Sequence, residues 1–364
     1  MGRKSYSSFA SRIVKLAKRA RDEETLETDR IAGVPHPRET MTLIGQDEAL
    51  ARAARAIRRG RPPQAWLIGG PPGVGKATFA YRVARYLLRY GATDAGPEDL
   101  SLPANDPVAA LVRAGAHPGL LAIKRGLNPD TGKLMTVLSV DEIRKLGNFF
   151  GLTSASGGWR IAVIDTADEM NDQAANALLK ILEEPPRRAM LMLLAHAPAR
   201  LASTIRSRCQ ALHLQPLSEA SFAAALAERL PQVSTADRAR LVALSGGSIG
   251  AALRLVGEDG LKLAAEAEKL IERAAAPDFA ATLALAERVA KFDRGMETFG
   301  VYLTQMLAAR ILARAREGAP HLDRWVELCN RIRASFVRSA ALHLEPRQTI
   351  VSAARAIAAR RAAL

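Results

Sequence analysis

The chain has 364 residues and a formal net charge of +15 at pH 7, and 48% of its residues are hydrophobic while 24% are charged. This length predicts two or three domains, and the composition is ordinary for a soluble globular protein. No apolar run approaches the ~20 residues that span a bilayer, and the basic N-terminus lacks the apolar core of a secretory signal, so we expect a cytoplasmic location and no membrane partner.

Cysteines and charge narrow the chemistry further. Cys209 and Cys329 lie far apart and neither belongs to a C-x-x-C pair, so no disulfide framework and no zinc or other metal site is predicted. The positive charge indicates an anionic partner, with nucleic acid favoured over a membrane. The alternative is that the arginines cover the solvated faces of Ala/Arg-rich helices.

The chain begins with a basic and then acidic extension over residues 1–38, which we expect to be flexible. The folded part is expected to start near Thr42. Short apolar runs then alternate with helical patterns, which predicts an α/β domain with a parallel sheet over residues 39–215. The runs are 66–68, 120–123, 161–164, 191–194 and 212–214.

A phosphate-binding loop (P-loop) follows the first apolar run. The stretch GGPPGVGKAT at 69–78 fits G-x-x-x-x-G-K from Gly70 through Gly75 to Lys76. Its glycines, Gly73 included, let backbone N–H groups surround a phosphate, and Lys76 would neutralise the outer phosphates. A helical pattern follows directly, so the strand, loop and helix of the motif are all predicted.

The loop lacks the group that holds magnesium. The residue after the lysine normally carries a hydroxyl that binds the metal, but here it is Ala77. Thr78 comes one residue late, about 100° further round the helix, and is a poor substitute. The sequence therefore predicts a nucleotide-type fold whose site is degenerate.

A second part of the same site is altered. The run RIAVID at 160–165 predicts a strand that ends in Asp165, a carboxylate suited to magnesium at the edge of a parallel sheet. Hydrolases of the AAA+ class carry a water-activating glutamate next, but this chain has Thr166. A threonine cannot act as a base near neutral pH, and the acids Asp168 and Glu169 are displaced along the chain.

Helical patterns occupy the remaining chain. A capping box at 139–142 begins one predicted helix, and another runs from Asp172 to Glu184 before two prolines. After Pro216 only helices are predicted, and two apolar stripes recur at helical spacing. These stripes are either an internal core or a surface for neighbouring subunits. They comprise Leu303, Met306, Leu307 and Ile311, and then Trp325, Leu328, Ile332 and Phe336.

Four further motifs occur in a linked order: Ile44-Gly45-Gln46, NALLKILEEPP at 176–186, TIRSRC at 204–209 and GSIGAAL at 247–253. With the P-loop they resemble the bacterial clamp-loader subunits of the AAA+ class. Because its hydrolysis site is degenerate, the chain is most similar to the delta-prime subunits of DNA polymerase III and not to the motor subunits. The resemblance covers residues 42–364.

The resemblance implies an architecture and a set of partners. We expect an AAA+ domain at 39–215, a helical lid at 216–258 and a helical collar for oligomerisation at 259–364. The partners would be motor subunits and a delta subunit, bound through the AAA+ and collar domains. The whole complex would load a sliding clamp onto primed DNA at replication forks in the nucleoid.

The resemblance also assigns a role to one arginine. In that family the Ser-Arg-Cys triplet sends an arginine into the ATP site of the neighbouring subunit, and the matching residue here is Arg208. A guanidinium there can donate two parallel hydrogen bonds to phosphate oxygens. From spacing alone, Arg208 is instead expected to cap a helix or to pair with a surface acid.

Departures from the active family pattern predict an inactive site. Active motor subunits carry a lid arginine where this chain has Gly250, and the sensor position falls near Ala195 and His196. His196 is expected to be a structural histidine and not a phosphate ligand. No cofactor is therefore required, although ATP or ADP is the ligand class that the degenerate loop would accept. Many relatives carry a zinc module in the region of 90–117, which has no cysteine here, so zinc is expected to be absent.

Two other functions stay open at this point. The chain could be a working DNA-dependent ATPase, such as a motor subunit, in which Thr78, Asp168 or ordered waters recruit magnesium. It could also be a direct DNA-binding module, which its charge permits.

Overall fold

The protein is described by a computed structural model covering residues 35–127, 135, 137–151, 158–257, 260–273, 278–291, 295–320, 322–342 and 344–360. Residues 1–34, most of the expected extension, lie outside this set. The chain divides into two compact units, Met1–Ala225 with Gly247–Ala251, and Leu226–Gly246 with Ala252–Leu364. The short segment Gly247–Ala251 thus belongs with the first unit, and the three-domain division stays a prediction.

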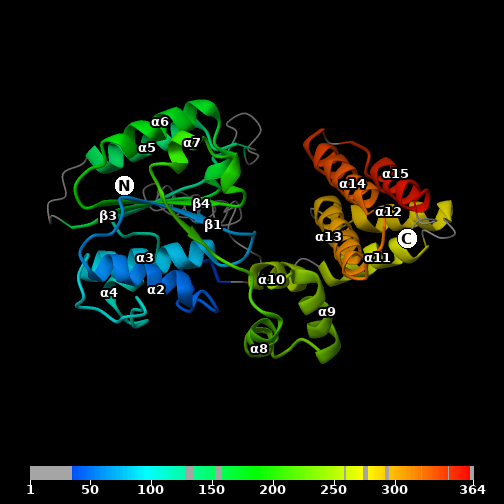
Figure 1. Ribbon diagram of the computed structural model, residues 1–364, viewed down its shortest axis with the longest axis horizontal. Coiled ribbons are helices and arrows are strands. Elements are labelled where there is room, and N and C mark those ends of the chain that lie inside the picture. The colour runs from blue at the N-terminus through cyan, green and yellow to red at the C-terminus, as the bar shows by residue number, and fades with distance from the viewer. Residues whose placement is uncertain are drawn as a thin grey trace, which may run out of the picture. The chain divides into compact units, whose positions relative to one another are not determined.

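Five parallel strands form the centre of the first unit, in the order β2-β3-β4-β1-β5 (Figure 1). Each strand overlaps a predicted apolar run, so the predicted parallel sheet is confirmed. The strands are β1 (Ala65–Gly69), β2 (Leu120–Ile123), β3 (Arg160–Ile164), β4 (Ala189–Ala195) and β5 (Gln210–His213). Strand β1 is flanked by β4 and β5, so the loop that follows it leaves the sheet from an interior strand.

Helices cover both faces of this sheet (Figure 1). On one face lie α2 (Asp47–Arg58), α3 (Lys76–Tyr90) and α4 (Pro107–Arg113). On the other lie α5 (Val140–Gly151), α6 (Asp172–Glu183) and α7 (Ser203–Arg206). Strand side chains alternate between two cores, with Trp66 and Ile68 packed on one face and Leu67 on the other. Short 3₁₀ turns follow β3 and β4, at Ala167–Glu169 and Pro198–Arg200.

The folded part starts earlier than Thr42. The side chain of His36 is only 1% exposed, and the fully buried guanidinium of Arg85 donates to the carbonyls of Arg38 (3.1 Å) and Thr40 (3.0 Å). Burial lowers the pKa of Arg85 to about 10. The predicted extension, residues 1–38, therefore includes residues that belong to the fold. Their polar sequence gives no hydrophobic signal, and Arg85 on α3 holds them by hydrogen bonds.

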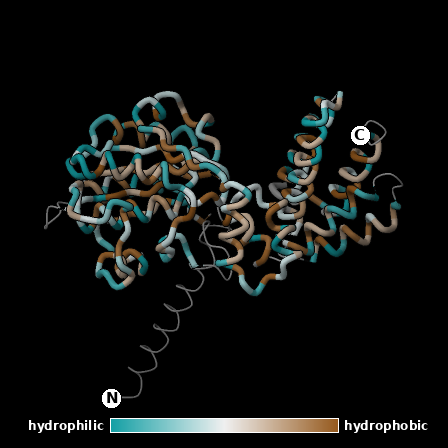
Figure 2. The backbone as a smooth tube through the Cα atoms, turned by 60° about the horizontal axis from the view of Figure 1, so that its bottom comes forward, coloured by the Kyte–Doolittle hydropathy of each residue, from teal (hydrophilic) through white to brown (hydrophobic). Residues whose placement is uncertain are grey.

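Only helices follow β5 in the described chain. They are α8 (Glu219–Arg229), α9 (Thr235–Ser245), α10 (Ile249–Gly257), α11 (Gly260–Arg273), α12 (Phe279–Ala290), α13 (Gly295–Arg316), α14 (Asp323–Leu342) and α15 (Pro346–Ala358). Both predicted stripes are mainly internal, since Leu303, Trp325 and Phe336 are buried. In Figure 2 these helices alternate between hydrophobic and hydrophilic residues, as partly solvated helices should. No helix within the described ranges is long and apolar enough to cross a membrane.

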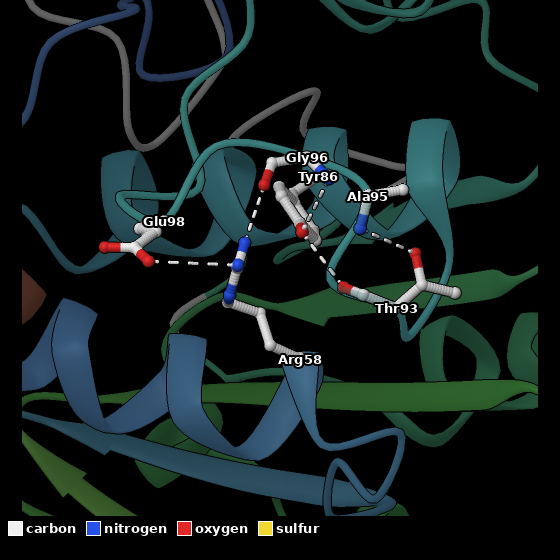
Figure 3. Close-up of polar contacts among 6 residues, drawn as sticks. All are labelled: Arg58, Tyr86, Thr93, Ala95, Gly96 and Glu98. Atoms are coloured by element: carbon white, nitrogen blue, oxygen red, sulfur yellow. Dashed lines mark hydrogen bonds and ion pairs between the residues drawn. The ribbon is translucent and has the colours of Figure 1, made fainter.

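Hydrogen bonds hold the loop between α3 and α4, the region where we expected no zinc (Figure 3). The Tyr86 hydroxyl donates to the carbonyl of Thr93 (3.0 Å) and accepts from the amide of Gly96 (3.3 Å). Arg58 reaches across from α2 and donates to the carbonyl of Gly96 at 2.6 Å. Among the described residues no group of three or more His, Cys, Asp and Glu could hold a metal, and the absence of zinc stays a prediction.

We expect Tyr86→Phe to loosen this loop, because the change removes one donor and one acceptor from a fully buried site. The local opening free energy should fall by about 1–2 kcal/mol, and the Gly96 amide should exchange with solvent roughly 5- to 30-fold faster. Hydrogen exchange measured by NMR provides the test. Tyr90→Phe is the matched control, since its ring lies 5.2 Å from that of Tyr86. Equal effects of both changes would contradict the assignment.

Candidate nucleotide site

The P-loop connects β1 to α3, as the motif requires. Its glycines take backbone conformations that other residues rarely adopt, with φ of +74° at Gly73 and +104° at Gly75. Gly75 is the N-cap of α3, so the first turn of that helix faces the loop. Strand, loop and helix are therefore all placed as the sequence predicted.

The side chain of the loop lysine, Lys76, bonds to other groups of the protein. The Lys76 ammonium donates to the carbonyls of Gly70 (2.7 Å) and Pro71 (2.9 Å), and it lies 2.8 Å from Nδ1 of His196. An ammonium has three N–H donors and no acceptor, so Nδ1 must be the accepting nitrogen. Lys76 is only 5% exposed. The three contacts account for all three donors that would otherwise neutralise a phosphate.

The segment Gly247–Ala251 packs directly on the P-loop, within the first unit. The amide of Gly250 donates to the carbonyl of Gly73 (2.9 Å), and the Ser248 hydroxyl donates to the carbonyl of Pro72 (2.9 Å). The approach is so close that a Cβ on Gly250 would lie 2.6 Å from the Cα of Gly73. A backbone amide and a side-chain hydroxyl of this segment therefore cover two carbonyls of the loop.

A buried glutamine links the loop to the end of the sheet. The Gln46 side chain donates to the carbonyl of Gln215 (2.7 Å) and accepts from the amide of the same residue (3.2 Å). It also lies 3.5 Å from the carbonyl of Val74 in the P-loop. The Ile44-Gly45-Gln46 motif thus fixes the loop relative to the chain that leaves β5.

The space beside Ala77 does not fit a magnesium ion. Ala77 and Asp165 line one cavity of about 30 Å³, together with the cationic residues Arg38 and Lys124, whereas Thr78 is not among its lining residues. The two cationic side chains beside Asp165 disfavour a divalent cation by like-charge repulsion. Ala77 supplies no oxygen ligand to such an ion.

The other acids near the site are already bonded. Asp168 accepts from the amides of His196 (3.1 Å) and Ala197 (2.8 Å), and Glu169 pairs with Arg125 at 3.2 Å. Thr166 has a φ of +50° and its amide donates to the Asp165 carboxylate (3.0 Å), while its hydroxyl is buried. Asp168, the acid that the alternative ATPase hypothesis offered, is therefore held by protein groups, and so is Glu169.

Arg208 is bonded to residues that do not belong to the P-loop. Its guanidinium donates to the carboxylate of Glu183 (2.9 Å) and to the carbonyl of Thr204 (3.0 Å), and its side chain is 38% exposed. In this chain by itself Arg208 thus pairs with a surface acid, as expected from spacing alone. That pairing leaves the role in a neighbouring subunit untested.

Four contributors to the site were missed in the sequence: Ser248, Glu183, Lys124 and Arg38. Ser248 and Glu183 stand inside quoted motifs, but only the fold brings them to the loop and to Arg208. Lys124 directly follows β2, a position from which a side chain reaches the carboxyl edge of the sheet, so its place in the chain was a usable signal. Arg38 gave none, because it lies in the segment taken for an extension.

Comparison with known proteins shows what the part of the chain around this site is similar to. The family described as "DNA polymerase III, delta subunit" matches residues 45–218. The delta-prime subunit of DNA polymerase III from Pseudomonas aeruginosa is 35% identical over 200 residues, which is 55% of this chain and 58% of that protein. The delta-prime subunit from Escherichia coli is 35% identical over 206 residues, covering 56% and 58%. Residues 45–218 are therefore similar to delta-prime subunits of DNA polymerase III.

The match spans somewhat more than half the length of these relatives. A solved gamma subunit-related protein of DNA polymerase III from Thermotoga maritima is 20% identical, with a TM-score of 0.46 over 87% of this chain and 99% of that one. The P-loop, the parallel sheet and the helical C-terminal part of the described chain confirm the expected architecture, an α/β domain with a parallel sheet followed by helices.

We expect Gly250→Ala to destabilise the first unit by about 1–3 kcal/mol, because the new methyl group would overlap the Cα of Gly73. Urea unfolding followed by tryptophan fluorescence measures the change. Gly147→Ala is the matched control in α5, where an added Cβ meets nothing within 4 Å. The control should be neutral or stabilising by up to about 1 kcal/mol. A loss no greater than that of the control would show that the contact is not tight.

Burial raises the pKa of the Cys209 thiol from its ordinary 9.0 to about 11. The folded state therefore holds this proton more tightly, so its contribution to stability is complete below about pH 9 and is lost as the pH rises through 11. In a Cys329→Ser background we expect folded Cys209 to react more slowly with iodoacetamide at pH 8 than in urea, since the thiolate is the nucleophile. Equal rates in the two states would contradict the raised pKa.

Proposed function

We propose that this chain is a clamp-loader delta-prime subunit that does not hydrolyse ATP itself and lends Arg208 to the ATP site of an adjacent motor subunit. The complex would load a sliding clamp onto primed DNA. The similarity of residues 45–218 to delta-prime subunits supports the assignment. The observation that carries the non-hydrolysing part is the state of Lys76, whose donors are taken by its own loop and by His196.

The contacts around the P-loop support the same conclusion. A phosphate would have to take the Lys76 ammonium away from the carbonyls of Gly70 and Pro71 and from His196. The cavity that Ala77 and Asp165 line also contains Arg38 and Lys124, whose positive charges disfavour a divalent cation. Nucleotide binding therefore requires these contacts to rearrange, and we propose that no nucleotide cofactor is needed.

The position of Arg208 suits a role outside its own subunit. It lies just beyond α7, on the surface, and it forms an ion pair with the exposed carboxylate of Glu183, a kind of pair that costs little to exchange. The net charge of +15 suits an assembly that follows the DNA backbone without reading its sequence. The partners proposed are the motor subunits, a delta subunit, the clamp and primed DNA.

In the reconstituted complex with clamp and primed DNA, Arg208→Ala should slow ATP turnover at the neighbouring site by roughly 10³-fold without preventing assembly. Steady-state ATPase rates and gel filtration provide the two measurements. Arg206→Ala is the matched control, because it removes an exposed arginine from the same motif. An unchanged rate with Arg208→Ala would refute the trans role.

The isolated chain should show no ATP turnover and no thermal shift with Mg-ATP. Turnover that is abolished by Lys76→Ala would instead identify a working ATPase, and the non-hydrolysing assignment would then be wrong.

A further inference from the structure

Glu183 and Arg208 form a polar contact between the end of α6 and the residues after α7. One terminal nitrogen of Arg208 donates to Glu183 (2.9 Å) and the other donates to the carbonyl of Thr204 (3.0 Å). We propose that Glu183 is a positioning residue, which holds the guanidinium so that its remaining donors face outward to an anionic phosphate on a neighbouring subunit. This inference rests on the proposed function of Arg208.

The donor count of the guanidinium supports a shared arrangement. Arginine has five N–H donors in a rigid planar fork, and the two contacts use one donor on each terminal nitrogen. The Nε–H and one N–H on each terminal nitrogen are therefore not used by these two contacts. A phosphate can receive a bidentate pair from these donors while Glu183 keeps its own bond.

The location of Glu183 argues against a role in helix stability. It is the last residue of α6, where the helix dipole disfavours a negative charge. The helix ends there before Pro185 and Pro186, and prolines cannot continue a helix. At this unfavourable end of the helix, the Glu183 carboxylate is stabilised by the guanidinium of Arg208, which follows α7.

The expected effect is modest because both partners are exposed, with side chains 38% and 52% accessible. Surface ion pairs of this kind change an equilibrium by roughly two- to fivefold. What the pair supplies is order, since a free arginine side chain samples many rotamers that the phosphate contact would otherwise have to restrict.

The test compares variants in the assembled complex with clamp and primed DNA. Glu183→Ala should lower kcat roughly two- to fivefold with no change in KM for ATP or in assembly. Glu183→Gln keeps an acceptor oxygen but loses the charge, so its kcat should be intermediate. The control is Glu184→Ala, which removes the adjacent exposed carboxylate and should leave kcat unchanged.

A double-mutant cycle separates positioning from a general structural role. In an Arg208→Ala background, Glu183→Ala should have no further effect, because its only route to the reaction is through that arginine. A faster rate with Glu183→Ala would show that the pair restrains Arg208 instead of positioning it, and the proposal would be overturned. An equal slowing in both backgrounds would also overturn it. If Arg208→Ala itself has no effect, the proposed function fails first and this inference fails with it.

Discussion

The site depends on where the Lys76 ammonium finds its acceptors. In a P-loop that binds nucleotide, phosphate oxygens accept from this group, and the loop backbone is arranged around them. Here two loop carbonyls and His196 accept instead. A buried cation must be compensated, and the protein compensates it internally.

That internal arrangement has consequences for the segment Gly247–Ala251, which packs on the loop. Because the loop presents carbonyls, a donor must cover them, and the Gly250 amide and the Ser248 hydroxyl do so. Only glycine at 250 permits the approach, since any Cβ would meet Gly73. The glycine that stands where the resemblance leads one to expect a lid arginine therefore provides a packing contact. The loop becomes a structural joint between the sheet and the start of α10.

The residues where magnesium would be expected, beside Ala77 and Asp165, also disfavour nucleotide chemistry. The methyl group of Ala77 offers no ligand to a divalent ion, and the cationic residues Arg38 and Lys124 beside Asp165 disfavour one. Asp168 has become an acceptor for two backbone amides, so it orders the turn after β4. We therefore propose that ATP is hydrolysed on another subunit, and that this chain contributes to that site through Arg208. Arg208 is suited to this because its surroundings are exposed and its ion pair is weak.

The sequence by itself determined the strands, the P-loop and the degenerate site, because these features are local. Apolar runs of three or four residues that alternate with helical patterns favour buried parallel strands, and Ala77 and Thr166 lack the required groups in any fold. Tertiary structure alone decided what takes the place of the missing phosphate. His196, Ser248 and Gly250 are 120 or more residues from Lys76 or from the loop, and spacing carries no signal of such contacts. The pairing of Glu183 with Arg208 was hidden for the same reason: a hydrogen bond needs two atoms close in space, and only the packing of α6 and α7 on one face of the sheet brings them together.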